Sequence, residues 1–330
     1  MPDPTPPIHT RVCDLFGITH PIVNAPMGGG DAPGELAAAV AQGGGLGMIG
    51  GTTAGDTTWL VDQVRRARQL TDRPIGVGIL SHRDSAQRLM DAALDEGVRV
   101  IAHSFADPTP FVAAAHDAGA LVICQVRTLA DAVQAARAGV DVITAQGTEA
   151  GGHTGHVSTL TLVPAIVDAV APIPVLAAGG IADGRAIAAA LMLGAEGVWI
   201  GTRFLATHEC GVTDAHKAAV IDAAIDATIL TDVYDIARGT PWPTDVSGRA
   251  IRDAFSDRWH GREEELRELV REEAHEPRDR AGVASDVRGH WAGEAARFVT
   301  EREHAADVVE LLARDARAVL TERTTALIDP

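Results

Sequence analysis

A glycine-rich segment, Ala145 to Gly155 with the sequence AQGTEAGGHTG, has the composition of a ligand-binding loop. It follows an apolar run over 140–144, so we expect the loop to lie at the carboxyl end of a strand. Glycines there let the backbone approach a ligand closely. His153 is the only imidazole in this segment, and histidine ordinarily titrates near enough to neutrality to transfer protons. We therefore predict that His153 is catalytic.

Two nearby groups, Glu149 and His156, raise the alternative that His153 belongs to a metal site. No fourth ligand follows at a spacing typical of zinc sites, so we predict no metal. Glu149 is instead expected to orient His153 or to cap a turn, and His156 is expected to support the loop. His82, which follows the third expected strand, is a weaker candidate for the rim of the same site.

Two short glycine segments, Gly179-Gly180 and Gly201-Thr202, each follow an expected strand. In barrel enzymes the loops after the last two strands commonly bind phosphate. Small residues let backbone amides point at an anion, Thr202 adds a hydroxyl, and a helix beginning near Asp183 adds its dipole. Either segment alone is compatible with an ordinary tight turn. Their occurrence after consecutive strands predicts a phosphate-bearing ligand.

Three side-chain amides fall at the ends of expected strands: Gln125, Gln146 and Asn24. An amide can both donate to and accept from a planar heterocycle, whereas a buried amide without a partner is costly. Each one alone could instead satisfy backbone groups at the barrel mouth. Together with the two glycine segments, they suggest a nucleotide-like cofactor with a polar ring.

The cysteines and the single lysine exclude other chemistry. Cys13, Cys124 and Cys210 are widely spaced and form no CxxC pair, so they indicate neither a disulfide framework nor a thiolate metal site. Cys124 is expected within a strand, which argues against a nucleophile. Lys217 is the only lysine and lies in a helical stretch, so a Schiff-base mechanism is not expected.

Eight short, apolar runs alternate with helical segments, which is typical of a parallel sheet with crossover helices. Eight such units close a (β/α)8 barrel. An open doubly wound sheet is the alternative, but glycines here follow five of the strands rather than only the first. The expected strands are Ile22–Ala25, Leu46–Ile49, Ile75–Ile79, Val98–Ala102, Leu121–Gln125, Val140–Thr144, Val175–Ala178 and Gly197–Ile200.

The composition changes near residue 228, where tryptophans and charged runs replace the alanine and glycine rhythm. We expect a mobile start over 1–10, a barrel over 11–229 and a helical region over 230–330 that covers the barrel mouth. Its charged run, 262–276, should form a solvated helix. A last helix near 305–320 could pack back on the barrel, and the stretch at Gly293 could approach the mouth or form a plain helix.

The overall charge disfavours two classes of partner. The chain has 45 acidic and 28 basic residues and a formal net charge of -17, which opposes nonspecific binding to nucleic acid or to anionic membrane. No signal peptide or membrane span is expected. We therefore predict a cytoplasmic monomer or homodimer that acts on a small molecule.

Several motifs in this order resemble the nitronate monooxygenase, or 2-nitropropane dioxygenase-like, flavoproteins. This family also includes flavin-containing enoyl reductases and NAD(P)H:quinone reductases. The motifs are Ala25-Pro26-Met27, Gly43-Gly44-Gly45-Leu46-Gly47, the AQGTEAGGHTG segment, Ala178-Gly179-Gly180-Ile181 and Ile200-Gly201-Thr202-Arg203-Phe204.

The resemblance implies a TIM barrel that binds FMN without a covalent bond, with His153 facing the flavin. It places the FMN phosphate on Gly180, Gly201 and Thr202. Relatives generally carry an asparagine after strand three, where this chain has Gly78. From the residues and the resemblance together, the predicted cofactor-binding set is Asn24, Ala25, Pro26, Met27, Gly78, Gln125, Gln146, Gly151, Gly152, Gly179, Gly180, Gly201 and Thr202.

Three functional hypotheses follow. The first is oxidation of an alkyl nitronate by O2 to a carbonyl compound and nitrite, with His153 as the base. The second keeps FMN but uses NAD(P)H as reductant, and reduces an enoyl thioester or a quinone with His153 as proton donor. The third is a barrel that binds a phosphorylated metabolite and regulates a partner without turnover.

Overall fold

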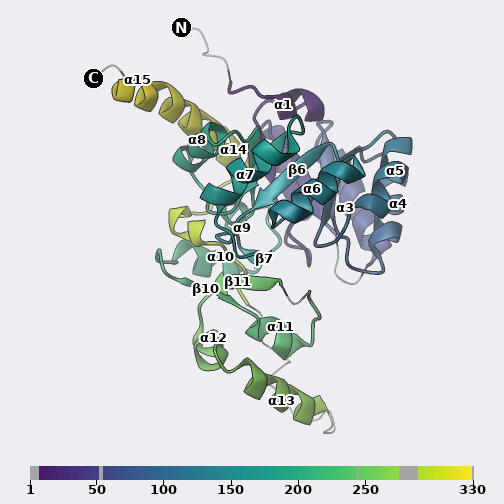
Figure 1. Cartoon of the computed structure of the whole chain (residues 1–330), viewed down its shortest axis with the longest axis vertical. Helices are drawn as coiled ribbons and strands as arrows, with labels where there is room; N and C mark the ends of the chain where they lie inside the picture. Colours follow the sequence, from purple (N-terminus) through teal and green to yellow (C-terminus); the bar gives the residue numbers. More distant parts are fainter. Residues whose placement is uncertain (1–6, 52–54, 244, 275–288, 329–330) are drawn as a thin grey trace.

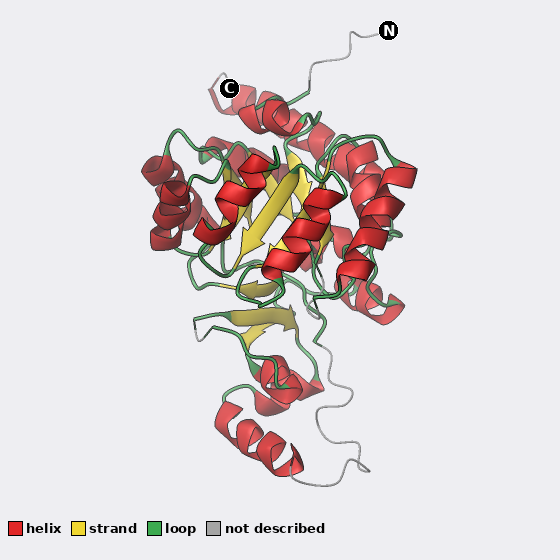
Figure 2. Ribbon diagram, turned by 90° about the vertical axis from the view of Figure 1, so that its right-hand side faces the viewer, coloured by secondary structure: helices red, strands yellow, loops and turns green. Residues whose placement is uncertain are grey.

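The computed structural model describes residues 7–51, 55–243, 245–274 and 289–328 (Figure 1). Residues 1–6 of the expected mobile start lie outside the described residues. Two layers of structure are visible along the long axis: a helix-wrapped barrel at one end, and a smaller sheet with helices at the other (Figures 1 and 2).

The barrel contains eight parallel strands in the order β1-β9-β8-β6-β5-β4-β3-β2, and a bridge between Val23 and Leu46 joins the two ends of this order. The TIM-barrel prediction is confirmed. The strands are almost entirely buried because helices cover their outer face, as the apolar runs predict. They are β1 (Ile22–Asn24), β2 (Gly47–Gly50), β3 (Ile75–Leu80), β4 (Val100–Ser104), β5 (Leu121–Val126), β6 (Val142–Gln146), β8 (Val175–Ala178) and β9 (Gly197–Ile200).

Helices follow the strands, and side chains cap the N-termini of α3, α6 and α8. Asp56, the N-cap of α3, accepts hydrogen bonds from the amides of Thr58 and Trp59. The helices around the barrel are α2 (Gly34–Gln42), α3 (Thr57–Leu70), α4 (Ala86–Asp95), α5 (Thr109–Asp117), α6 (Leu129–Ala138), α7 (Thr159–Val170) and α8 (Gly184–Met192). The short α9 (Thr202–Leu205) and α10 (Asp214–Ile221) follow β9.

Helices from the two ends of the chain complete the barrel. α1 (Arg11–Phe16) buries Val12, Cys13 and Phe16 against inward-facing strand residues, and so closes the amino-terminal end of the barrel. α14 (Ala305–Ala318) packs against both α8 and α2, which is where an eighth barrel helix belongs. It is followed by η2 (Val319–Arg323) and α15 (Thr324–Ile328). No described helix is long and apolar enough to cross a membrane.

The second layer consists of the described residues of 228–299 together with β7 (Gly152–Thr154), and it is called the cover here. Its sheet has the antiparallel order β10-β11-β7, in which β10 is Thr228–Thr231 and β11 is Ser247–Ile251. The expectation of a wholly helical region after residue 230 is therefore wrong, since β11 lies inside it. The other elements are α11 (Val233–Arg238), α12 (Ala254–Trp259), α13 (Glu263–Ala274) and the 3-10 helix η1 (Glu294–Phe298).

Candidate active site

His153 lies in β7, at the edge of the small sheet and just beyond the carboxyl end of β6. It pairs with Gly248 of β11, so it stands on a short strand and not on the free loop that we expected. Its Nε2 lies 2.8 Å from Oδ2 of Asp235 on α11. Both side chains are about nine-tenths buried, with 10% and 9% exposed. The cover therefore supplies a carboxylate that fixes the orientation of the imidazole.

Asp235 is itself held in place. Its second oxygen, Oδ1, accepts a hydrogen bond of 3.2 Å from Arg238 of the same helix. The guanidinium of Arg238 also lies 5.6 Å from the ring centre of Trp291. Sequence reasoning missed Asp235 because nothing in the local pattern around an acidic residue on α11 points to a partner 82 positions earlier.

The loop residues beside His153 have separate tasks. The carboxylate of Glu149 accepts hydrogen bonds from the amide and the hydroxyl of Thr159, at 3.0 Å and 2.8 Å for Oε2. Glu149 therefore caps the start of α7. Capping was one of its two expected roles. The other, orienting His153, belongs to Asp235. His156 is exposed.

Aromatic rings cover His153. The indole of Trp242 is stacked on its imidazole, with ring centroids 3.6 Å apart and 14° between the planes. Trp291 lies 5.0 Å from the same imidazole. Trp242 also contacts His82 at 4.9 Å and Phe105 at 5.0 Å. In the sequence, Trp242 was notable only as one of the tryptophans in the region after residue 228 where the composition changes.

His82 belongs to this aromatic cluster, close to where we expected a rim residue. Burial, the positive charge of Arg83 and the proximity of His153 lower the pKa of His82 to about 4, so it is neutral at physiological pH. Both ring nitrogens of His82 and Nε1 of Trp242 are buried without a hydrogen-bond partner among the described residues. Unpaired polar atoms of this kind are costly and point to a ligand with polar groups of its own.

Two of the three predicted amides form a chain that ends at His153. Nε2 of Gln125 donates to Oε1 of Gln146 at 2.9 Å, and Nε2 of Gln146 donates to the carbonyl of His153 at 3.1 Å. Asn24 does not join them. Its amide is fully buried and bonds both the amide and the carbonyl of Met48, so it satisfies the barrel backbone and offers no free group to a ligand.

The two glycine turns are neighbours. β8 and β9 are paired, with Ala178 opposite Trp199, so the turns that follow them lie side by side. Gly179 and Gly180 have φ of +101° and +72°, which favours glycine at both positions. At the N-terminus of α8 the carboxylate of Asp183 accepts from the amide of Ala186, so a side chain already occupies the dipole end that we expected to face a phosphate.

Thr202 contacts the cover. Its Oγ1 accepts a hydrogen bond of 2.9 Å from the amide of Gly293. Gly151 and Gly293 pack backbone to backbone, because a Cβ on Gly151 would lie 2.5 Å from the Gly293 nitrogen. The stretch at Gly293 therefore reaches the barrel mouth, as the sequence suggested. Arg249 also joins the loop to the cover. It donates a hydrogen bond to the carbonyl of Thr148 and forms an ion pair with Glu294.

The position of Pro26 explains why this chain has Gly78 after strand three, where relatives carry an asparagine. A Cβ on Gly78 would lie 2.1 Å from the ring of Pro26, so the proline ring fills the space that a side chain would need. Ala25 and Met27 both lie beside Gly201, since a Cβ on that glycine would be 3.4 Å from the Ala25 Cβ and 3.7 Å from the Met27 sulfur. Gly152 has open space around it. These residues line the same end of the barrel as the two turns.

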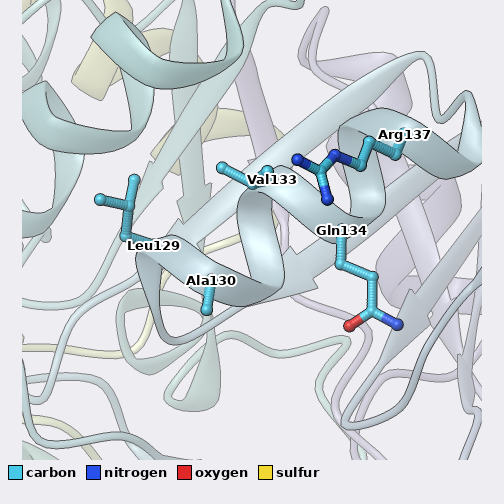
Figure 3. A pocket seen from close by; sticks show the side chains of 5 residues that line it. All are labelled: Leu129, Ala130, Val133, Gln134 and Arg137. Atoms are coloured by element: carbon cyan, nitrogen blue, oxygen red, sulfur yellow. The ribbon is translucent and has the colours of Figure 1, made fainter.

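Other reactive groups lie away from this site. Burial raises the pKa of Cys124, within β5 as predicted, to about 12, and that of Cys210 to about 11, so neither carries a thiolate at neutral pH. Among the described residues, no group of three or more His, Cys, Asp or Glu side chains is placed to hold a metal ion. A surface hollow on α6 contains none of the site residues and is lined by Leu129, Ala130, Val133, Gln134 and Arg137 (Figure 3).

Sequence comparisons find curated relatives of this chain. The chain is 40% identical over 230 residues to (3aS,4S,5R,7aS)-5-hydroxy-7a-methyl-1-oxo-octahydro-1H-indene-4-carboxyl-CoA dehydrogenase of Mycobacterium tuberculosis, over 69% of this chain and 64% of that protein. The match thus spans less than two thirds of that relative. A probable nitronate monooxygenase of Staphylococcus aureus is 32% identical over 279 residues, 69% of this chain and 77% of that protein.

A solved structure is also similar to this chain. FabK from Thermotoga maritima superposes with a TM-score of 0.84 at 32% identity, covering 97% of this chain and all of FabK. The family model described as nitronate monooxygenase matches residues 9–93 and 81–315. These similarities are to enzymes and give no support to the hypothesis of a barrel without turnover. The chain belongs to the nitronate monooxygenase family.

Proposed function

We propose that the protein is an FMN-dependent oxidoreductase that acts on an acyl thioester, with His153 transferring the proton. The observation that carries the proposal is the buried pair of His153 and Asp235 beside two adjacent glycine turns. The sequence alone put nitronate oxidation first. The relatives of higher identity shift the preference to a thioester.

The residues at the mouth fit a flavin mononucleotide. Oγ1 of Thr202 accepts from the Gly293 amide, and because a hydroxyl can accept and donate at the same time, Thr202 could also donate to a phosphate oxygen. Around Gly180 a Cβ would meet only the side chain of Glu149, at 3.5 Å, so its backbone has room for a ligand. The linked amides of Gln125 and Gln146 would present donor and acceptor atoms to the polar edge of the ring.

Bound FMN would supply the hydride donor or acceptor, which no side chain at this site provides, and NAD(P)H would be the external reductant in the reducing direction. The protein's own contribution is proton transfer. His153 donates its Nε2 hydrogen to Asp235, which leaves the lone pair on Nδ1. The Asp235 carboxylate also stabilises the imidazolium that forms when His153 takes up a proton.

With a thioester substrate, the carbon next to the carbonyl gains or loses the proton. Neutral His153 removes it when the substrate is oxidised, and protonated His153 returns it when an enoyl thioester is reduced. Two relatives, from Mycobacterium tuberculosis at 40% identity and Rhodococcus jostii at 38%, carry a CoA-linked substrate in their names. Both names describe a dehydrogenase, which supports hydride and proton chemistry here.

Nitronate oxidation is the second candidate. It is supported by the Staphylococcus aureus relative and by a nitroalkane oxidase of Streptomyces ansochromogenes, which superposes with a TM-score of 0.77 at 29% identity. In this reaction His153 would remove the acidic proton of a nitroalkane, and O2 would be consumed as the carbonyl compound and nitrite form.

An absorption spectrum and an anaerobic mixing experiment test these proposals. The purified protein should be yellow, and extraction should release FMN. Rapid bleaching with NADH or NADPH, followed by return of the colour when an enoyl thioester is added, supports the first candidate. Bleaching by a nitronate but by neither pyridine nucleotide supports the second. A colourless protein that does not take up added FMN contradicts both.

A further inference from the structure

The turn after β3 places two nitrogen-bearing side chains close to the rings above His153. His82 and Arg83 lie in this turn, which follows β3 and precedes α4. The ring of His82 lies 4.9 Å from the ring of Trp242, and the guanidinium of Arg83 lies 5.6 Å from that same ring. Trp242 is in turn stacked on His153, with the ring centroids 3.6 Å apart. His82 and Arg83 therefore both contact the indole that covers the imidazole.

This cluster of His82, Arg83 and Trp242 contains hydrogen-bonding atoms without partners. Both ring nitrogens of His82, Nε of Arg83 and Nε1 of Trp242 are buried and form no hydrogen bond among the described residues. The guanidinium and indole nitrogens are donors only, and a neutral imidazole has one N–H as well. Buried N–H groups without an acceptor are costly, because they have lost their water. The cluster therefore offers three donors to an acceptor that a ligand can supply.

The charge of the cluster favours a negatively charged acceptor. Arg83 forms no ion pair with any described carboxylate, although the chain contains 45 acidic residues. The nearby carboxylate of Asp235 is already paired with His153 and Arg238. Burial and the positive charge of Arg83 lower the pKa of His82 to about 4, so His82 stays neutral while Arg83 carries the charge. An anionic oxygen would match both the donors and this charge.

We propose that His82, Arg83 and Trp242 bind the substrate oxygen that becomes negatively charged when His153 removes a proton from the neighbouring carbon. The inference rests on the proposed function, in which His153 transfers that proton. In a thioester the oxygen is that of the carbonyl group and the anion is an enolate. In a nitroalkane it belongs to the nitro group and the anion is a nitronate. The chemistry is shared: an oxyanion conjugated with the carbon that loses its proton.

The proton transfer is balanced without an oxidant. In a thioester the C–H bond next to the carbonyl breaks, the proton moves to Nδ1 of His153, and the electron pair of that bond forms a carbon–carbon double bond. The π electrons of the carbonyl move onto its oxygen, which becomes negative and accepts hydrogen bonds from the cluster. Donors already in place before this charge develops stabilise the transition state more than the neutral substrate.

The three donors differ in how the fold holds them. His82 and Arg83 lie in a short turn between two barrel elements, whereas Trp242 lies in a segment of the cover outside any helix or strand. The unpartnered atoms are buried in this structure, so the substrate oxygen has to displace a neighbouring side chain as it enters. We expect the indole of Trp242 to shift, and we expect Trp242 to contribute less than Arg83.

Hydrogen exchange measures the proton transfer without any redox step. The purified full chain is incubated in D2O with butyryl-CoA or with nitroethane, and deuterium at the acidic carbon is followed by mass spectrometry. Arg83→Met removes the charge and the donors at similar length, and Arg83→Lys restores the charge. Arg88→Met is the matched control, because Arg88 is an exposed arginine of α4, five positions later in the chain.

Arg83→Met should slow exchange on the order of 10²-fold or more, since loss of one donor from such a site costs that much. Arg83→Lys should recover part of the rate, and Arg88→Met should exchange as the wild type does. Trp242→Phe keeps a ring beside His153 but lacks the N–H, and should slow exchange about tenfold. Wild-type exchange in Arg83→Met overturns the proposal.

Binding of acetoacetyl-CoA gives a second measurement, which a general loss of structure would not reproduce in Arg88→Met or reverse in Arg83→Lys. Its enolate absorbs in the near ultraviolet, so a difference spectrum reports how much of the bound ligand is ionised. The wild type should favour the enolate. Arg83→Met should shift the ionisation constant of the bound ligand about tenfold or more toward the neutral form. An ionisation constant that is the same in both overturns the proposal.

The two measurements separate this proposal from the function on which it rests. If His153→Asn abolishes exchange but Arg83→Met does not slow it, the oxyanion site is wrong and the role of His153 stands. If neither substrate exchanges, yet the wild type stabilises the enolate and Arg83→Met does not, the oxyanion site stands and the proposed proton transfer is wrong. Exchange of butyryl-CoA alone identifies an enolate as the occupant, and exchange of nitroethane alone identifies a nitronate.

Discussion

The barrel is determined mainly by residues close together in the sequence, whereas the cover depends on contacts between distant residues. Each barrel strand is a short, mostly apolar run, and glycines follow several of them, so residues close together in the sequence determine it. β7 of the cover is only three residues long and depends on pairing with Ser247–Arg249, almost a hundred positions later. The turns suited to a phosphate therefore belong to the local part of the fold, and the partner of His153 belongs to the part built by distant contacts.

The largest effect should come from His153 itself, where the two parts meet. His153→Asn should lower turnover on the order of 10²–10⁴-fold, since general acid–base catalysis contributes that much. Thermal unfolding is measured alongside, because His153→Asn also removes a partner of the buried Asp235 carboxylate and is expected to lower stability. Steady-state kcat measures the loss, and His156→Asn, at an exposed position, is the control. Turnover equal to that of the wild type would remove His153 from the chemistry.

The next effect tests the distant contact. Asp235→Asn keeps the shape but presents an amide hydrogen to Nε2, which favours the tautomer with hydrogen on Nδ1 and removes the free lone pair. We expect kcat to fall by roughly 10- to 100-fold, the range seen when a partner that orients a histidine is replaced. Asp232→Asn, at the start of the same helix, should be near wild type. Equal losses in the two variants would mean that Asp235 acts only through α11 stability.

A third prediction concerns the barrel alone. Gly78→Ala forces a Cβ to 2.1 Å from the Pro26 ring, so the free energy of unfolding should fall by about 1–3 kcal/mol. Gly28→Ala meets nothing closer than 3.5 Å and should change stability by less than about 0.5 kcal/mol. Urea denaturation followed by circular dichroism measures both. Equal stability of the two variants would show that the Pro26 ring moves away without cost.

The fourth prediction is the pH dependence of stability, which is spread over several pH units and compares a histidine inside the barrel with one that bonds the cover. His103 lies on β4, and His216 of α10 lies with its Nε2 3.1 Å from the carbonyl of Trp291. Burial lowers the pKa of both to about 4 from a usual value of 6.5. Below pH 6.5 the unfolded chain binds protons that the folded chain does not, so stability should fall as pH drops from 6.5 toward 4.

The slope should be at most about 1.4 kcal/mol per pH unit for each such histidine. His103→Gln and His216→Gln should each reduce it, as measured by urea unfolding at several pH values within this window. His9, which is exposed, serves as the control in His9→Gln. A slope that neither variant changes would show that other groups cause the acid sensitivity.

The sequence was sufficient to predict the eight strands and the adjacent glycine turns, because glycine placement and apolar runs act locally. The catalytic role of His153 stays a prediction. It was not sufficient for β7, since Gly-His-Thr has no alternating pattern, or for Asp235 and Trp242, which become neighbours of His153 only through the pairing of β11 with β7. Asn24 was assigned to the cofactor because a buried amide that satisfies Met48 looks the same in sequence as one that faces a ligand.

The return of α14 to the barrel has a consequence for how such an enzyme can diversify. Because α14 packs between α8 and α2, the part of the cover after β9 is an insertion whose two ends are both anchored on the barrel. Its length and side chains can change while the glycine turns after β8 and β9 keep their places. Substitutions confined to this one insertion could thus change the substrate specificity while the barrel and its glycine turns stay the same.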